Sequence, residues 1–231
     1  MNILVIIPTY NEEKTIGKLI DDLFLLNLKL DILIVDDGTD SLPDIVKEKQ
    51  KKHKNLFLHK RSKKAGRGTA VLYGLRFALE KKYNFMVEMD ADFSHQPSEL
   101  PDLMNLAGQN TVVIASRYDK GSKIENWSFR RRFFSSLANF YANLILGIGI
   151  SDYTNGFRVY GREAINKLDL DKIRSSGYIV LSEIAYSLYK MDVNFKTRKT
   201  LFINREHGES NFTIKEIREA FLSVWRIKFD N

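Results

Sequence analysis

The chain has 231 residues, of which 44% are hydrophobic and 28% are charged, and it carries a formal net charge of +7 without a single cysteine. This composition excludes a disulfide-stapled fold, a thiolate metal site and a largely disordered chain, and the lack of thiols fits a reducing compartment. The length suits one α/β domain, and the positive charge indicates an anionic partner: a phosphorylated substrate, a nucleic acid or an anionic membrane.

The first half of the chain alternates short β-rich runs with longer helical patterns. Strands are predicted over 2–7, 31–35, 55–59, 84–89 and 111–115, and helices near 12–27, 42–52, 68–81 and 98–106. No basic segment precedes the first apolar run, so we interpret it as a strand and not as a signal peptide. The alternation predicts a mostly parallel sheet with helices on both faces.

Polar loops follow four consecutive predicted strands. In open sheets of this kind, ligands bind at the carboxyl ends of the strands. The candidates are Pro8, Tyr10 and Glu12 after the first strand, Asp36 and Asp37 after the second, Lys64, Gly66 and Gly68 after the third, and Asp90 and Asp92 after the fourth. The sequence therefore predicts one binding site at this edge of the sheet.

The most specific of these loops is Asp90-Ala91-Asp92, at the end of the apolar run 85–89. Two carboxylates in this arrangement can converge on Mg²⁺ or Mn²⁺ that also bridges a substrate diphosphate, which makes a nucleotide-sugar transferase the first hypothesis. The plain alternative for an isolated D-x-D is a solvated turn in which an Asp caps the backbone.

The other three loops have physical roles available in nucleotide binding. Residues after the first strand can cap a helix or place the Tyr10 ring near a base. Asp36 and Asp37 can accept hydrogen bonds from a base or ribose. The glycines at 66 and 68 permit close backbone approach to phosphate, with Lys64 and Arg67 supplying charge, although a lone G-x-G is weak and the G-K-[ST] ending of a Walker loop is absent.

The second half contains a stretch without charged residues, 133–150, directly after Arg130-Arg131-Arg132. Its polar interruptions argue against a membrane span. Two interpretations remain open: an amphipathic helix at a membrane interface, with arginines at the headgroups, or a helix packed on the core. The segment 213–231 combines an apolar stripe with Trp225 and basic residues and predicts a second amphipathic helix.

Taken in order, these motifs resemble the inverting family-2 nucleotide-sugar glycosyltransferases of GT-A fold, and among them the dolichol-phosphate mannose synthases. The resemblance covers nearly the whole chain. It rests on the segments 7–12, 35–38, 64–70 and 89–97, and then on Ser116-Arg117-Tyr118, Trp127 with Arg131, 152–158, Gly177-Tyr178 with Glu183, and 205–210.

The resemblance implies a role for each matching position. Asp90 and Asp92 would hold the metal, with Asp92 as the more direct ligand. Ser94 stands where some members have a ligating Gln, so water would complete the coordination shell of the metal. The base and ribose would lie against Pro8, Tyr10, Glu12, Asp36 and Asp37. Arg205 and Ser210 would close over the diphosphate, Arg117 and Arg131 would receive the acceptor phosphate, and Asp152, Asn155 and Glu183 would surround the sugar.

The expected function is thus the inverting, metal-dependent transfer of mannose from GDP-mannose to a dolichyl or polyprenyl phosphate. Two alternatives stay open: a UDP-sugar (glucose or N-acetylhexosamine) transferase using the same lipid phosphate, and a noncatalytic basic module that binds nucleic acid or membrane. A lipid phosphate needs no general base, because its second pKa near 6 leaves it mostly dianionic at neutral pH.

The expected organisation is a single domain over 1–231, with a nucleotide-sugar half (1–116), an acceptor half (117–212) and a C-terminal amphipathic helix (213–231). The favoured interpretation places the enzyme at the cytoplasmic face of a membrane as a peripheral protein. A separate membrane-anchoring subunit is a possible partner, and nucleic acid is not an expected one.

Overall fold

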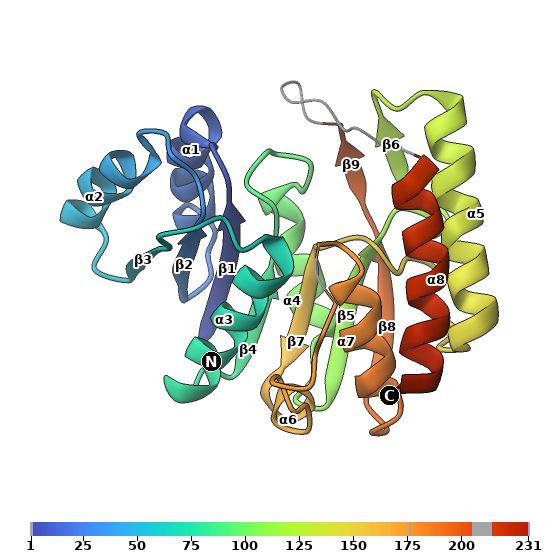
Figure 1. The fold of residues 1–231 in the computed structure, drawn as a ribbon. Coiled ribbons are helices and arrows are strands. Elements are labelled where there is room, and N and C mark those ends of the chain that lie inside the picture. Colours follow the sequence, from blue (N-terminus) through green and yellow to red (C-terminus); the bar gives the residue numbers. More distant parts are fainter. Residues whose placement is uncertain (1, 176, 205–213, 231) are drawn as a thin grey trace.

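The computed structural model describes the chain except residues 1, 176, 205–213 and 231, and it does not describe the side chains of 214–220 and 230 (Figure 1). The first half follows the predicted order. Its elements are β1 (Ile3–Thr9), α1 (Glu13–Phe24), β2 (Leu30–Asp36), α2 (Leu42–Lys52), β3 (Leu56–Lys60), α3 (Arg67–Glu80), β4 (Phe85–Glu88), the short 3₁₀ helix η1 (Pro97–Glu99), α4 (Leu100–Leu106) and β5 (Thr111–Ser116). The α/β expectation for this half is confirmed.

The periodicity of the sequence explains why these segments are helical. On α1, for example, the buried residues are Ile16, Leu19, Ile20 and Leu23, which recur at the spacing of one helix face. On β1 and β2, nearly every side chain is buried because helices cover both faces of the strands.

The second half departs more from the predicted pattern. It contains β6 (Lys123–Glu125), α5 (Phe129–Leu146), β7 (Arg158–Gly161), α6 (Arg162–Asn166), α7 (Val180–Tyr189), β8 (Asn194–Lys199), β9 (Leu201–Ile203) and α8 (Ile214–Asp230). Only α5 and α8 were predicted. The arginine triplet lies inside the first turn of α5 and not ahead of it, because Ser128 caps the helix by accepting a hydrogen bond from the Arg131 N–H.

Within the described residues, the central sheet has seven strands in the order β3-β2-β1-β4-β7-β5-β8. All neighbours are parallel except β7, which runs antiparallel to both β4 and β5. The prediction of a mostly parallel sheet is confirmed. A separate parallel pair, β6 and β9, lies beside it.

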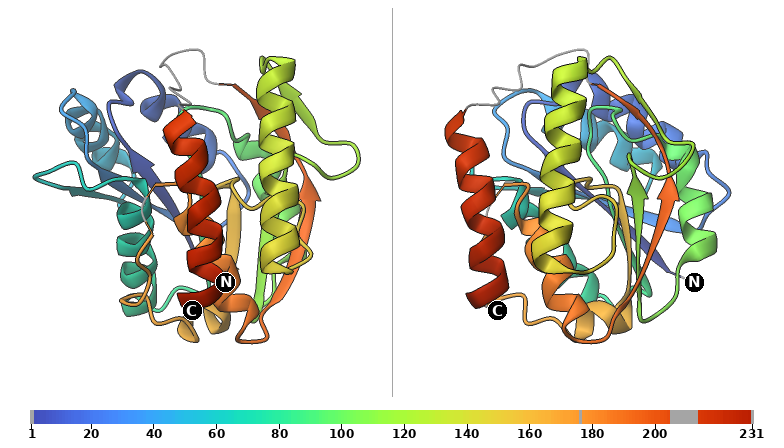
Figure 2. Two further views of the ribbon diagram at one scale, coloured as in Figure 1. Left: turned by 45° about the vertical axis from the view of Figure 1, so that its right-hand side comes forward. Right: turned by 90° about the vertical axis from the view of Figure 1, so that its right-hand side faces the viewer.

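Helices cover both faces of this sheet (Figure 2). One core layer packs α1, α2 and α4 against the sheet, and the other packs α3, α6 and α7, together with the inner sides of α5 and α8. Helices α5 and α8 lie side by side, and the centres of the Tyr141 and Phe221 rings are 4.3 Å apart. Since β1 and β4 are neighbours, with Ile6 opposite Glu88, the loops after these strands meet at one edge.

No helix among the described residues combines the length and apolar character needed to cross a bilayer.

Candidate active site

A cleft of about 220 Å³ lies at the carboxyl ends of β1, β2 and β4. Its lining includes eight of the predicted site residues, namely Pro8, Tyr10, Glu12, Asp37, Lys64, Gly66, Asp90 and Asp92. Thr9, Arg61, Arg67, Ala70, Ala91 and Tyr178 complete it. The structure therefore brings together residues from the loops after β1, β2, β3 and β4 and, through Tyr178, from the second half of the chain.

Asp90 is held by a guanidinium that the sequence analysis placed only in a general electrostatic role. Arg67 donates to Asp90 Oδ1 from Nε at 3.0 Å and from Nη2 at 2.8 Å, and its Nη1 lies 2.7 Å from Glu88 Oε1. Burial is the largest single effect and disfavours the charged form of Asp90, but the nearby positive charges, Arg67 foremost, together with the Arg67 hydrogen bonds hold the pKa of this carboxyl below its ordinary value. Asp90 is therefore a carboxylate at neutral pH.

Asp92 is shaped by a tight turn. Phe93 has a left-handed backbone with φ of 59°, and the Ser94 N–H donates to Asp92 Oδ1 at 3.0 Å. The second carboxylate oxygen of Asp92 accepts no hydrogen bond from the described residues. In the part of the chain that the structure describes, Asp90 and Asp92 are not joined by a further Asp, Glu or His in a group of three metal-binding side chains.

His95 ties the Asp90-Ala91-Asp92 loop to the second half of the chain. Its Nδ1 accepts from the Asp90 N–H at 3.0 Å, and its Nε2 lies 2.7 Å from Asn155 Oδ1. Since Nδ1 must accept, the ring is the neutral tautomer that donates from Nε2 to Asn155. The ring is buried and stacks on Phe157, with centroids 5.3 Å apart. Sequence reasoning did not assign this role.

Asp37 organises the loop after β3. Arg61 binds both of its oxygens, at 2.5 and 2.6 Å, and the backbone N–H groups of Ala65 and Gly66 each donate to Oδ2 at 3.0 Å. Gly66 has φ of 90°, which favours glycine at this position. The loop is thereby fixed so that Lys64 Nζ lies 3.6 Å from the centre of the Tyr10 ring, at the lining of the cleft.

Asp36 lies beneath the cleft and not along its lining. Its side chain is fully buried, accepts from Thr9 Oγ1 and the Gly38 N–H at 2.9 Å each, and pairs with Lys60 Nζ at 2.7 Å. Gly68 is likewise a packing position, because a Cβ there would lie 3.1 Å from Val180.

Arg117 forms a buried ion pair with Asp152. Nε and Nη2 donate to the two Asp152 oxygens at 2.8 Å each, Nη2 also donates to Thr154 Oγ1 at 2.6 Å, and the Arg117 N–H donates to Asp152 at 3.0 Å. Burial is the largest single effect and opposes both charges, but the ion pair and its hydrogen bonds, with smaller effects of other neighbours, raise the pKa of Arg117 and lower that of Asp152. No described residue accepts a hydrogen bond from Arg117 Nη1.

Arg117 and Arg131 meet at one indole. The guanidinium carbons lie 5.4 Å and 4.2 Å, respectively, from the centre of the Trp127 ring, and Arg131 Nη1 donates to Asn204 Oδ1 at 3.0 Å. Trp127 Nε1 is buried and donates to none of the described residues. The predicted pair of arginines thus shares a site with an unpaired N–H donor.

Two further predicted residues hold the backbone in place. Asn155 donates to the Ala115 carbonyl and contacts His95, as described above. Glu183 accepts from the N–H groups of Arg174 and Ser175 at 3.1 and 2.7 Å, which fixes the segment ahead of Tyr178. Arg205 and Ser210 lie outside the described residues.

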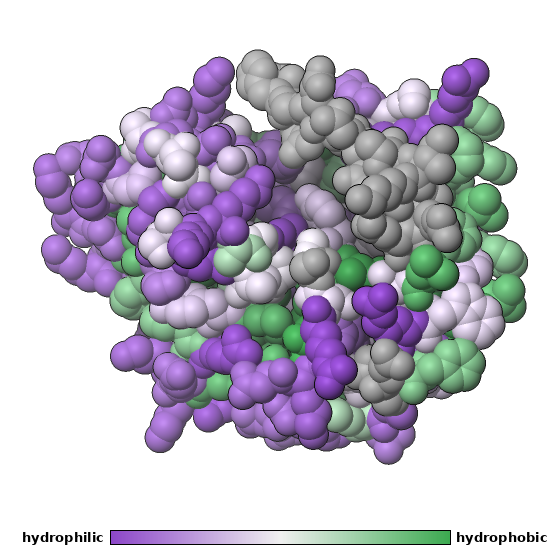
Figure 3. Space-filling model, viewed as in Figure 1, coloured by the Kyte–Doolittle hydropathy of each residue, from purple (hydrophilic) through white to green (hydrophobic). Residues whose placement is uncertain are grey.

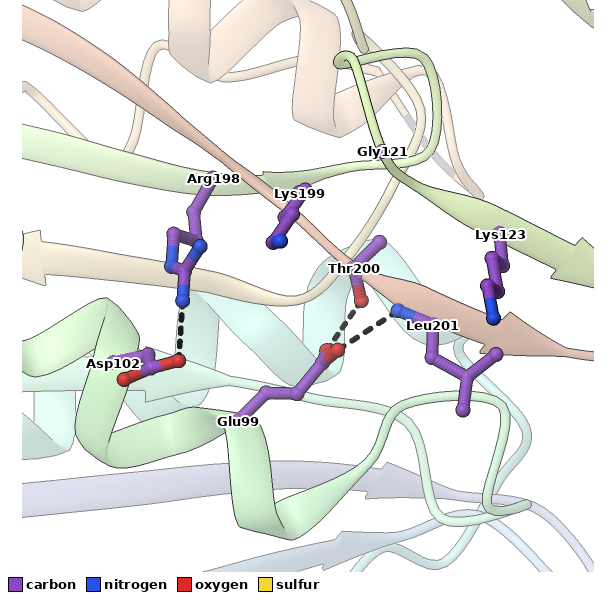
Figure 4. Close-up of a pocket in the computed structure, with 8 residues that line it drawn as sticks. All are labelled: Glu99, Asp102, Gly121, Lys123, Arg198, Lys199, Thr200 and Leu201. Atoms are coloured by element: carbon purple, nitrogen blue, oxygen red, sulfur yellow. Dashed lines mark hydrogen bonds and ion pairs between the residues drawn. The ribbon is translucent and has the colours of Figure 1, made fainter.

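A second hollow, of about 190 Å³, lies away from these groups between α4 and the strands β8 and β9 (Figure 4). Arg198 pairs there with Asp102 at 2.5 Å, and Glu99 accepts from Thr200 Oγ1 and from the Leu201 N–H. Glu99 thus anchors the start of β9, and the next residue, Phe202, packs its ring against Trp127 and His95.

Known proteins resemble this chain in sequence and in fold. Residues 4–169 match the model of glycosyl transferase family 2. Polyprenol monophosphomannose synthase of Mycolicibacterium smegmatis is 36% identical, over 97% of this chain and 87% of that protein. Undecaprenyl-phosphate mannosyltransferase of Micrococcus luteus is 34% identical, over 98% of this chain and 93% of that protein.

Among solved structures, the fold is similar to that of glucosyl-3-phosphoglycerate synthase from Mycobacterium tuberculosis. In its complex with UDP, the TM-score is 0.68 at 17% identity, covering 99% of this chain and 79% of that one. A complex of the same synthase with Mn²⁺, UDP and glucosyl-3-phosphoglycerate gives a TM-score of 0.67 at 17% identity, covering 98% of this chain and 78% of that one. The expected GT-A fold is confirmed, and the chain belongs to glycosyl transferase family 2 and is a glycosyltransferase.

Proposed function

We propose that this glycosyltransferase moves mannose from GDP-mannose to a polyprenyl phosphate with inversion at the anomeric carbon. The observation that carries the proposal is the adjacency of two differently charged sites. Asp90 and Asp92 line the cleft, and the buried Arg117, close enough to Asp90 for each to shift the other's pKa, meets Arg131 at the Trp127 ring. Two relatives named as polyprenyl-phosphate mannose transferases support the choice of acceptor and sugar.

The diphosphate of the donor would meet two features of the cleft that favour an anion. They are the Lys64 ammonium and the N-terminal end of α3. Tyr10 is 45% exposed and presents a ring face on which a base can stack.

The proposed cofactor is Mg²⁺ or Mn²⁺, held by Asp90 and Asp92. Both are carboxylates, the ligands that these hard cations prefer, and one Asp92 oxygen accepts no hydrogen bond from the described part of the chain. A solved relative of similar fold contains Mn²⁺ together with UDP. When bound, such an ion supplies positive charge that stabilises the departing diphosphate.

The acceptor phosphate would lie against Arg117, Arg131 and the Trp127 N–H. Arg117 Nη1 and Trp127 Nε1 donate to none of the residues that the structure describes, and a phosphate oxygen would satisfy both donors. Their positive surroundings offset the repulsion between two phosphorylated substrates. The phosphate attacks as a dianion, so no side chain has to remove a proton.

The assay that tests this proposal offers a short polyprenyl phosphate with a panel of GDP- and UDP-sugars, with and without Mn²⁺. We expect lipid-linked mannose from GDP-mannose and Mn²⁺, and no product once EDTA removes the metal. Transfer from UDP-glucose or UDP-N-acetylhexosamine alone would replace the mannose assignment with the UDP-sugar alternative. Failure of every sugar to reach the lipid would overturn the acceptor assignment.

A membrane surface is the proposed source of the acceptor. One side of α5 packs on the core through Asn139, Ala142 and Leu146. Its other side exposes large apolar residues, which gather along the right-hand edge of the molecule in Figure 3: Phe129, Phe133, Phe134, Leu137, Phe140 and Leu144. Trp225 and Phe229 of the neighbouring α8 are exposed too. Aromatic residues beside basic ones suit a lipid headgroup region.

The double change Phe140→Asp with Leu144→Asp tests this surface, since these residues are 67% and 70% exposed. We expect co-sedimentation with anionic lipid vesicles to fall by at least about tenfold, because burial of each side chain in lipid contributes about 1.5–3 kcal/mol. The matched control is Leu25→Asp, an exposed apolar residue at the end of α1, which should leave vesicle binding unchanged. Equal binding by all variants would exclude α5 as the membrane contact.

A further inference from the structure

Arg67 already places a positive charge at the proposed metal site. It is the first residue of α3, and its guanidinium reaches Asp90 and Glu88 at once through the bonds given above. The centre of its guanidinium also lies 4.9 Å from the centre of the Tyr178 ring. Its side chain is only 13% exposed, so this is an internal ion pair and not a surface contact.

The surroundings of Arg67 fit its guanidinium closely. A Cβ at position 156 would clash with Arg67 Nη2, so a larger residue in place of Gly156 would displace the guanidinium. Glu88 is fully buried, and its other oxygen accepts from the Tyr160 hydroxyl at 3.0 Å. A buried Glu88 without Arg67 would be an uncompensated charge.

Because the Arg67 guanidinium is already one positive charge at Asp90, this arrangement weakens the binding of a divalent metal ion there. Asp90 Oδ1 already accepts two hydrogen bonds from Arg67, and a divalent ion bound at Asp90 would be repelled by the adjacent guanidinium. Mg²⁺ and Mn²⁺ take about six ligands, and the described residues bring no third carboxylate to Asp90 and Asp92. The nucleotide diphosphate has the oxygens and the negative charge that the protein lacks.

We infer that Arg67 is a resident counter-ion of Asp90 which makes tight binding of the divalent ion conditional on the nucleotide diphosphate. The inference rests on the proposed metal site and adds its regulation. By linkage, the factor by which the nucleotide tightens metal binding is also the factor by which the metal tightens nucleotide binding. The arrangement keeps the metal from occupying the carboxylates before the donor arrives.

The test measures Mn²⁺ binding by calorimetry, without nucleotide and with saturating GDP, and needs no turnover. Arg67→Leu alone would leave Glu88 without its counter-ion. The informative comparison is therefore between the single variant Glu88→Gln and the double variant that combines Glu88→Gln with Arg67→Leu. The amide can still accept from Tyr160, and thermal unfolding checks that both variants fold. Arg67→Lys keeps the charge and serves as the conservative variant.

For the wild type, we expect GDP to tighten Mn²⁺ binding by at least about tenfold. Adding Arg67→Leu to Glu88→Gln should tighten nucleotide-free Mn²⁺ binding by about tenfold and shrink the effect of GDP, because the repelling charge is gone. Arg67→Lys should retain the dependence on GDP.

Two results would overturn the inference, and they differ in what else they affect. In the first, the double variant binds Mn²⁺ without nucleotide no more tightly than Glu88→Gln does. This result would disprove the role of Arg67 but not the metal site. In the second, the wild type binds no Mn²⁺ even with saturating GDP or UDP. This result would disprove the proposed metal site itself.

Discussion

Asp92→Asn is expected to lower mannosyl transfer by on the order of a thousandfold, because a metal at this position supplies several kcal/mol of transition-state stabilisation. The substitution changes charge and little else. The amide oxygen of Asn can still accept the Ser94 N–H, so the turn at Phe93 should persist and thermal unfolding in metal-free buffer should stay close to that of the wild type. Mn²⁺ binding in the presence of GDP should be lost together with activity.

Asp102→Asn provides the matched control for this experiment. Asp102 lies on α4 and pairs with Arg198 beside the second hollow, outside the cleft (Figure 4). We expect its transfer rate to equal that of the wild type. If Asp92→Asn kept both its rate and its Mn²⁺ binding, the assignment of Asp92 as a metal ligand would be wrong.

The meeting of these loops at one cleft was predictable because it depends on local signals. Strands that alternate with helices indicate a parallel sheet, and ligands bind at the carboxyl ends of its strands. Tyr10, Asp37 and Asp92 each follow such a strand, and the structure brings all three to one cleft. None of these assignments required knowledge of which side chains touch.

The antiparallel strand β7 could not be predicted in the same way. It enters the sheet between β4 and β5, next to strands that precede it by many residues. A run of four residues, Arg158–Gly161, has no periodicity that distinguishes it from a loop, and its leading Arg158 is fully buried. That charge is acceptable there because carbonyl groups, including those of Asn155 and Leu181, accept its hydrogen bonds at 2.8 Å.

The partners of buried charged side chains were the second feature that the sequence did not predict. Asp152 and Glu183 were expected near the sugar because of motif resemblance, but their carboxylates are occupied by Arg117 and by backbone N–H groups. One signal was available for Arg67: Glu88 stands within an apolar strand, and a buried carboxylate needs a cation or a hydrogen-bond donor. The sequence does not say which of 36 Lys and Arg residues meets it.

Arg117→Lys is expected to lower transfer to the lipid phosphate by on the order of a hundredfold. Arg117 uses a planar fork, in which Nε and Nη2 bind Asp152 and Nη1 donates to no described residue, so that Nη1 is the proposed donor to the acceptor phosphate. A lysine ammonium is a point charge that cannot hold Asp152 bidentately and also reach a phosphate in the same geometry. Loss of a bidentate, charge-assisted contact of this kind costs about 2–3 kcal/mol.

The expected kinetic pattern separates this role from general damage to the fold. GDP and Mn²⁺ should bind as tightly as to the wild type, since Arg117 does not line the donor cleft, whereas the KM for polyprenyl phosphate should rise. Arg198→Lys makes the same chemical change at the Arg–Asp pair outside the cleft and should leave both measurements unaltered. A lysine variant with normal KM and kcat would place the acceptor phosphate away from Arg117, because the Asp152 pair alone would then account for this buried arginine.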